Sequence, residues 1–383
     1  MVISSVGECI KRVLRITAVR NYRSLAVIEP IIRMDKPLLI VTSPLTYNVI
    51  LALAVLLIRY NLGLETHLTF AGSINEDRVN KLTQSYESVM LIGLENNTKQ
   101  VLQGNIINMN HVAGSQSMQL IDPTLIGPLS NWPRASRILY LIYMVGLAID
   151  EYGPSTVDLL STMISDGLIK VKNTSLPLNL SNDTAESLSL SLWPIVLDEG
   201  ELDLKSPEGL MESLVNASLR RGFMGSYADY LLMSTPYVMN LNAALAYLII
   251  ESLLWNTATR DDGFQVPSID FKLLNSIILG KFNEAVDRVK AYVNEVKARL
   301  MTIIGGLGRE KLVTYDIKPS NLTLMARLCQ VLSFHRFRNS IRLTLTYDSL
   351  TLVCVPNPNV EVTMSNAVSF NKTLKFMLIT TKD

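Results

Sequence analysis

The sequence contains few of the residues that build metal centres and disulfide frameworks. Three cysteines and three histidines occur in 383 residues. Cys9, Cys329 and Cys354 are far apart and form no CxxC pair, so they indicate neither a disulfide framework nor a zinc site. Because disulfides are rare in reducing compartments, this cysteine usage fits an intracellular protein, and we expect it in the cytoplasm.

An excess of one charge is also lacking. The 35 Lys and Arg residues oppose 34 Asp and Glu residues, which leaves a formal net charge of +1. The whole protein therefore has no general electrostatic attraction to nucleic acid, although a local basic patch is not excluded. A hydrophobic content of 48% excludes intrinsic disorder. At roughly 100–200 residues per domain, the length predicts two or three domains.

No charged residue lies between Lys36 and Arg59. The stretch is long enough for a membrane span, which needs about 20 apolar residues. A polar, proline-containing break at residues 42–48 divides it, however. We therefore predict a strand at Leu38–Val41, a turn and a helix at Val49–Tyr60, with no membrane insertion.

Strand-like and helical runs alternate through the first 150 residues, as expected of βαβ units in a parallel sheet. The further strands are predicted at His67–Phe70, Val89–Leu94 and Ile106–Met109, and a second helix at Glu76–Tyr86. The fold class is therefore α/β. We expect three regions: a parallel-sheet α/β domain at 1–155, a mostly helical middle region at 156–265, and a C-terminal α+β domain at 266–383.

The later regions carry helical and then β-rich patterns. The predicted helices are Ala135–Ile149, Ser206–Leu219, Asn240–Trp255 and residues 282–300. The helix at 240–255 is apolar nearly throughout, and its single acidic residue, Glu251, favours burial within the protein over a membrane span. The predicted strands are Ile341–Tyr347 and Leu350–Val355, followed by a turn at Pro356–Asn359.

The turn after the first strand is where an α/β phosphoesterase would keep carboxylates for its metals. Here it reads Thr-Ser-Pro-Leu-Thr-Tyr-Asn, from Thr42 to Asn48, and contains no acidic residue. Leu45 and Tyr47 are the central positions, and neither side chain can act as a hard anionic ligand.

The order of elements resembles the DHH phosphoesterase superfamily, and specifically its RecJ-like branch. In that family one strand ends in His-x-Asp-x-Asp, a second in Asp and a third in Asp-His-His, and an Asn-Pro loop carries a further Asp. These residues hold two divalent metals that activate water. On this chain the corresponding positions are Leu45 and Tyr47, Leu94 beside Glu95, Met109-Asn110-His111, and Leu129 in the loop that begins at Asp122. The family's Gly-Gly-His segment is not found near the C-terminus.

The resemblance implies a fold that has lost its chemistry, since only His111, and Glu95 in a shifted register, keep a ligand type. It predicts a non-enzymatic protein without metal or cofactor, similar to the archaeal GINS-associated RecJ and CDC45-like replication proteins. The implied partners are GINS, MCM through GINS in a CMG-type helicase, and single-stranded DNA as a further candidate, in a nucleoid-associated setting.

Two alternatives stay open. One is an active metal-dependent phosphoesterase or single-strand exonuclease whose site is built from Glu95, His111 and Asp122. The other is an unrelated α/β interaction protein or membrane-associated factor. Tight binding of Mn²⁺ is expected only of the enzyme, and failure to copurify with GINS would favour the unrelated protein.

One segment combines aromatic and basic residues near the C-terminal strands. It reads Phe-His-Arg-Phe-Arg from Phe334 to Arg338, and Arg342 follows. Arg336, Phe337, Arg338 and Arg342 are candidates for binding single-stranded DNA, because bases stack on aromatic rings beside arginine. The alternative is an amphipathic helix with Phe inside and Arg outside.

Overall fold

The structure is a computed structural model. It describes residues 34–71, 76–94, 102–103, 106–109, 133–151, 164, 169–172, 203, 205–223, 235–238, 241–255, 264–265, 270–307, 312–318, 321–347, 350–356, 367–368 and 377–382. The loop that begins at Asp122, up to residue 132, and residues 357–359 of the predicted turn lie outside these ranges.

A six-stranded sheet forms the N-terminal domain. Four of its strands are mutually parallel, as the sequence predicted, and the structure gives their order as β5-β3-β1-β2. They are β1 (Leu38–Thr42), β2 (Thr66–Ala71), β3 (Ser88–Ile92) and β5 (Ile106–Met109). The short strands β4 (Leu102–Gln103) and β9 (Phe264–Gln265) pair antiparallel at the two edges, so the middle region contributes a strand to this domain.

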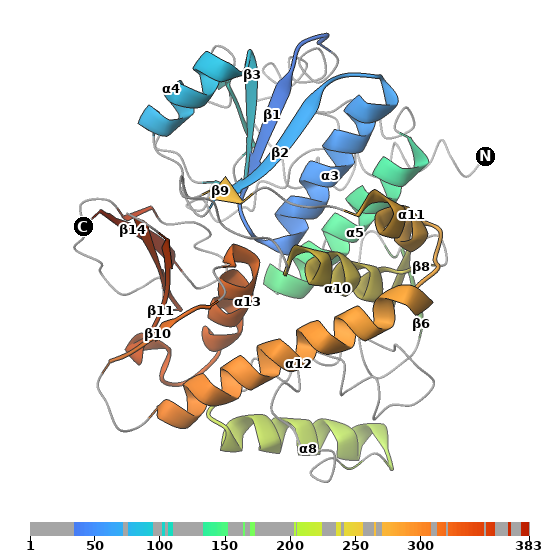
Figure 1. Ribbon diagram of the computed structural model, residues 1–383. Helices are drawn as coiled ribbons and strands as arrows, with labels where there is room; N and C mark the ends of the chain where they lie inside the picture. The colour runs from blue at the N-terminus through green and yellow to red at the C-terminus, as the bar shows by residue number, and fades with distance from the viewer. Residues whose placement is uncertain are drawn as a thin grey trace.

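Helices cover both faces of this sheet (Figure 1). On one face lie α3 (Thr46–Asn61) and α5 (Arg134–Glu151), and on the other lies α4 (Glu76–Ser85). Side chains along β3 point alternately to the two faces of the sheet. Met90 and Ile92 belong to the large core on the α3 side, and Val89 and Leu91 lie on the α4 side. Both faces are therefore buried, which explains the continuous apolar strands.

The apolar stretch between Lys36 and Arg59 is the strand and helix that the polar break predicted. Its terminal charge, Arg59, is buried and donates hydrogen bonds to the backbone carbonyls of Met34, Lys36 and Glu65, and to the Thr66 hydroxyl. Among the described residues, no helix is long and apolar enough to cross a membrane.

The middle region is helical around a small sheet that the sequence did not indicate. This three-stranded sheet pairs β6 (Ile169–Lys172), β7 (Thr235–Val238) and β8 (Leu241–Asn242). The helices of the region are α8 (Pro207–Arg220) and α10 (Ala243–Leu254), and α11 (Phe271–Ile278) follows just beyond the predicted boundary at residue 265. Ser206, Asn242 and Asp270 accept a backbone N–H bond at the starts of these helices, as N-cap residues do. Every residue of α10 is buried, as its apolar sequence predicted.

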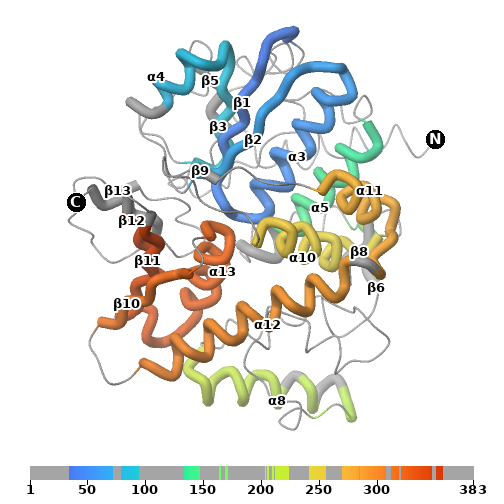
Figure 2. Tube along the Cα trace, in the orientation of Figure 1, coloured from blue at the N-terminus to red at the C-terminus, as the bar shows by residue number. Residues whose placement is uncertain are grey.

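The long helix α12 (Asn283–Gly306) leads into the C-terminal domain. Val289, Val293, Val296 and Leu300, at spacings of three and four, lie on its buried side, and Val286 of the same predicted apolar face is partly buried. A five-stranded sheet follows, in the order β10 (Val313–Asp316), β11 (Ile341–Tyr347), β12 (Leu350–Val355), β14 (Met377–Lys382) and β13 (Ala367–Val368). Its helix α13 (Leu322–Leu332) lies between this sheet and the helices α10 and α12 (Figures 1 and 2).

The C-terminal domain contains one disulfide, which the spacing of the cysteines did not indicate. Cys329 on α13 is bonded to Cys354 on β12, with their Cα atoms 6.3 Å apart. That separation lies within the usual range for a disulfide. Twenty-five residues separate the two positions in the chain, and they meet only because α13 packs on the sheet.

Candidate functional site

The topology of the N-terminal sheet identifies one edge as the place for a site. From β1 the chain crosses through α3 to β2 on one side, and it then returns through α4 to β3 on the other side of β1. The carboxyl ends of β1 and β3 therefore form a topological switch point. In open α/β sheets, ligands bind in the crevice outside the strands at such a point.

Strand register places the ends of β1, β3 and β5 at this edge, where three of the four predicted motifs begin. Thr42, the last residue of β1, pairs with Ile92, the last residue of β3, and Ile92 pairs with Met109, the last residue of β5. The strand ends are therefore level. The turn that contains Leu45 follows the end of β1, and the segment that contains Leu94 follows the end of β3. Both segments therefore begin at the same edge of the sheet.

The edge between β1 and β3 is closed by packing. The backbone N–H of Ser43 donates to the carbonyl of Ile92 over 2.9 Å, which extends the pairing of the two strands past their ends. The Asn48 amide donates from Nδ2 to Oγ of Ser43 over 2.8 Å, and both side chains are buried. Gly93 has a φ of +66°, and a Cβ atom there would lie 2.0 Å from Nδ2 of Asn48. The polar side chains at this edge therefore form a hydrogen bond with each other in a closely packed environment.

Leu45 and Tyr47, at the positions of the two family aspartates, belong to the protein core. Leu45 is the N-cap residue of α3 and is 3% exposed, and Tyr47 in the first turn is fully buried. The Tyr47 ring points toward α5, where its centroid lies 6.2 Å from that of Tyr143. A carboxylate in place of Tyr47 would be buried beside the Tyr143 ring.

The other predicted positions are distributed differently. Leu94 is buried on the α4 side of the sheet, with Val41 and Val79, so its side chain is not part of the switch-point edge. Met109 ends β5. Asn110, His111 and Leu129 lie outside the described residues, as do Glu95 and Asp122 of the alternative enzyme site. Within the described part of the chain, no group of three or more His, Cys, Asp or Glu residues could hold a metal ion.

Sequence reasoning missed Ser43, Asn48 and Gly93 as the residues that close the edge. A signal was present for one of them. Gly93 directly follows a continuous apolar strand, a position where a glycine often marks the close approach of another segment. The partner Asn48 could not be identified, because the contact joins elements that are distant in the chain.

Replacing Gly93 with alanine is expected to lower the free energy of unfolding by about 2–4 kcal/mol, through left-handed strain and collision with Asn48. Gly63 is the matched control, since its φ is +71° but a Cβ atom there meets nothing within 4 Å. Gly63→Ala should cost only the strain, about 1–2 kcal/mol. Urea denaturation of both variants measures the difference. Equal losses would show that the edge has room beside Gly93.

The segment from Phe334 to Arg338 is a turn, so the predicted alternative of an amphipathic helix is wrong. Helix α13 ends at Leu332, and a short 3-10 helix begins at Arg338. Phe334 is buried, as that alternative expected of its Phe residues. Arg336 is exposed, and its guanidinium lies 4.8 Å from the centroid of the ring of Phe337, which is 39% exposed. The turn thus presents a stacked Arg–Phe pair on the surface.

The remaining candidates for DNA contact lie close to this turn in the chain. Arg338 is partly buried. Arg342 on β11 donates from Nη1 to the carbonyls of Asn339 and Ile341, which directs its side chain along its own backbone. Of the four candidates, Arg336 and Phe337 are therefore the most exposed.

His335 supports this turn with both ring nitrogens. The backbone N–H of Phe337 donates to Nδ1 over 3.2 Å, so Nε2 carries the proton and donates to the carbonyl of Arg221 over 3.0 Å. The ring packs edge-on against Phe223, at 5.3 Å between centroids. Burial lowers the pKa of His335 against the opposing effect of the hydrogen bond to Arg221, and the charge of Arg336 lowers it further. The loop after α8 thereby holds the turn in place through the neutral imidazole.

Stability is expected to fall at acidic pH because of His335. Its folded pKa is lowered, so its contribution is complete above the unfolded value near 6.5 and is lost as pH falls through the folded value. His335→Gln keeps a donor for Arg221 without a titrating ring. We expect the loss of unfolding free energy between pH 7.5 and pH 5 to be smaller in this variant than in the wild type. Equal losses would contradict the role of His335.

The turn belongs to a charge-biased part of the chain. Residues 317–347 contain no Asp or Glu, and their basic residues are Lys318, Arg327, Arg336, Arg338 and Arg342. Residues 317–383 contain eight Lys and Arg against three Asp and Glu, whereas the rest of the chain has 27 against 31. The near-neutral net charge of the whole chain therefore hides an excess of basic residues in the C-terminal domain. This excess is visible in the sequence.

Comparison with known proteins finds similar solved structures but no match by sequence. No protein-family model matches the chain, and no curated protein matches it by sequence. The mixed α/β fold is similar to solved structures of CDC45 and RecJ.

CDC45 from Entamoeba histolytica is 11% identical, with a TM-score of 0.47, over 98% of this chain and 96% of that one. RecJ from Thermus thermophilus in complex with Mn²⁺ is 10% identical, with a TM-score of 0.40, over 96% of this chain and 53% of RecJ. An exonuclease RecJ bound to manganese is 11% identical, with a TM-score of 0.37, over 88% of this chain and 83% of that one. The chain thus spans about half of the Thermus enzyme.

Proposed function

We propose that this protein is a non-catalytic RecJ-like scaffold of an archaeal, CMG-type replicative helicase assembly. It binds GINS and, through GINS, contacts the MCM helicase. One observation carries the non-catalytic part: the two positions for carboxylates at the switch point hold Leu45 and Tyr47, both buried. Two-metal hydrolysis needs anionic ligands that fix both ions. Burial of these residues leaves no place for such ligands in the first turn of α3.

A nuclease assay with purified full-length protein tests the loss of chemistry. Labelled single-stranded DNA is incubated with Mn²⁺, and we expect no degradation above a heat-treated control. Titration calorimetry with Mn²⁺ should show no stoichiometric site. Degradation that disappears in His111→Ala, together with tight Mn²⁺ binding, would instead establish the enzyme built from Glu95, His111 and Asp122.

The scaffold part is tested by direct association with GINS. Equimolar protein and GINS from the same organism are passed over a sizing column with light-scattering detection. We expect a complex whose mass is the sum of its parts, and recruitment of MCM only when GINS is present. Separate elution of the two proteins at micromolar concentration would overturn the proposed partner.

Single-stranded DNA is the further ligand that we propose, at the exposed Arg336–Phe337 pair. Removing one phosphate interaction with a single strand reduces the salt dependence of log K by about 0.7. Arg336→Ala with Arg338→Ala should therefore weaken binding at low salt and reduce this slope by about 1.4. Lys81→Ala on α4 is the control for an exposed charge elsewhere. Unchanged affinity in the double variant would exclude DNA binding at this turn.

A further inference from the structure

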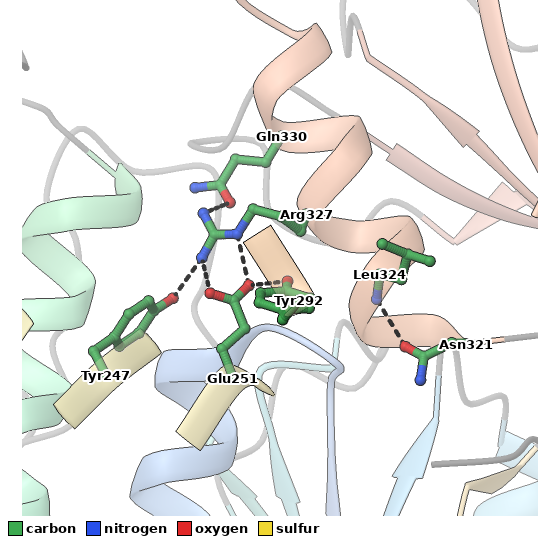
Figure 3. Close-up of polar contacts among 7 residues, drawn as sticks. All are labelled: Tyr247, Glu251, Tyr292, Asn321, Leu324, Arg327 and Gln330. Atoms are coloured by element: carbon green, nitrogen blue, oxygen red, sulfur yellow. Dashed lines mark hydrogen bonds and ion pairs between the residues drawn. The ribbon is translucent and has the colours of Figure 1, made fainter. Parts of the chain in front are cut away.

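A buried ion pair joins two helices that belong to different regions of the chain. Glu251 lies on α10 of the middle region and Arg327 on α13 of the C-terminal domain, and their exposures are 1% and 3%. Arg327 donates from Nε to Oε1 of Glu251 over 2.6 Å and from Nη2 to Oε2 over 2.9 Å. This two-point contact specifies orientation as well as distance (Figure 3).

Neighbouring side chains complete the hydrogen bonding of both charges. Tyr292 on α12 donates its hydroxyl to Oε1 of Glu251 over 2.9 Å. Burial and the Glu251 carboxylate raise the pKa of Tyr292, so the hydroxyl stays a neutral donor. Arg327 also donates to the Tyr247 hydroxyl at 3.0 Å and to Oε1 of Gln330 at 2.8 Å. Three helices thus meet at one polar cluster (Figure 3).

A second contact joins the same two helices at their ends. Asn321 accepts the backbone N–H of Leu324 through Oδ1, and so caps the start of α13. Its Nδ2 donates to the carbonyls of Leu254 and Trp255, where α10 ends. One buried side chain therefore satisfies the first turn of α13 and the last turn of α10 together.

Close packing also connects these contacts among α10, α12 and α13 to the N-terminal domain. A Cβ atom at Gly146 of α5 would lie 2.5 Å from Cε2 of Tyr247 and 3.3 Å from Cβ of Tyr47. The Tyr247 side chain, whose hydroxyl accepts from Arg327, is thus seated against α5 beside the first turn of α3. That turn begins at the closed switch-point edge.

We propose that Glu251, Arg327, Tyr292, Tyr247 and Gln330 form an inter-domain clasp that fixes the C-terminal domain against the N-terminal sheet domain. A small relative displacement would separate the charges without admitting water, and an unpaired buried charge is strongly unfavourable. The two domains therefore move as one body, with no opening and closing across the switch-point edge. This inference rests on the described contacts and does not depend on the proposed partners.

Distance measurement between spin labels tests the clasp. Labels are attached at Lys81→Cys on α4 and Lys318→Cys beside β10, both exposed, in a Cys9→Ser background that keeps the disulfide. We expect one narrow distance distribution in the wild type. Glu251→Gln, which removes the charge at constant shape, should broaden it or add a second distance. A folded Glu251→Gln protein with the narrow wild-type distribution would overturn the clasp.

Two matched variants complete the test. Glu295→Gln removes a partly exposed ion pair with Arg299 within α12 and should leave the distribution unchanged. Tyr292→Phe deletes only one hydroxyl, and it replaces Glu251→Gln if that variant does not fold. It should broaden the distribution by less than the charge removal does, and a distribution identical to that of the wild type would likewise contradict the proposal.

Discussion

Arg327→Ala is expected to lower the free energy of unfolding by about 3–5 kcal/mol, the usual cost of leaving one partner of a buried ion pair alone. Glu251, which is 1% exposed in the wild type, would keep the Tyr292 hydroxyl as a donor but would lose the charge of Arg327. Glu251→Ala should cost a similar amount, because the guanidinium then loses the carboxylate in the same cluster. Urea denaturation followed by circular dichroism gives these values.

A double variant separates the pair from general packing damage. Because either single substitution already destroys the interaction, Glu251→Ala with Arg327→Ala should cost clearly less than the two single losses added together. Glu295→Ala, which breaks a partly exposed pair of the i,i+4 type, should cost only about 0–1 kcal/mol. Additive losses at Glu251 and Arg327 would mean that the two charges do not stabilise each other.

Tyr47→Asp is expected to unfold the protein and not to restore a metal site. Removing the fully buried ring leaves a cavity worth about 3–5 kcal/mol, as for other large aromatic truncations. The new carboxylate would also be buried beside Tyr143 without a cation, which adds a further penalty. The sum approaches the whole stability of an ordinary domain, about 5–15 kcal/mol.

Tyr60→Asp provides the control on the same helix. Tyr60 is 77% exposed, so its replacement should change the free energy of unfolding by no more than about 0.5 kcal/mol. The measurements are thermal unfolding and Mn²⁺ titration of both variants. A Tyr47→Asp protein that keeps wild-type stability and binds Mn²⁺ would show that the edge still has the space of a metal site.

Local pattern was sufficient to predict the main elements. Strand β5 and strands β11 and β12 have the predicted bounds, and α3 and α5 differ from prediction by only a few residues. Continuous apolar runs of strand length and a 3.6-residue period are properties of neighbouring residues, so they are visible without a structure. The small sheet of β6 (Ile-Lys-Val-Lys), β7 (Thr-Pro-Tyr-Val) and β8 (Leu-Asn) was missed because none of its strands is a continuous apolar run.

Contacts between distant segments could not be predicted in this way. The turn at Phe334–Arg338 departs from a helix where the loop after α8 reaches it: the Arg336 N–H donates to the carbonyl of Gly222 over 2.8 Å. Gly222 has a φ of +86°, and a Cβ atom there would lie 2.7 Å from Nε2 of His335. The two segments are far apart in the chain, so their docking depends on how α8 and α13 are placed.

The sequence by itself determined that the turn from Thr42 to Asn48 has no carboxylate, and that the predicted apolar helix at 240–255 carries a single charge, Glu251. Both facts follow from residue identity, and the first of them excludes anionic ligands at Leu45 and Tyr47. Tertiary structure alone decided that Gly93 closes the edge against Asn48 and that Glu251 meets Arg327, 76 residues away. The physical reason is that a buried charge needs a partner within a few ångströms, and helix packing decides which partner is there.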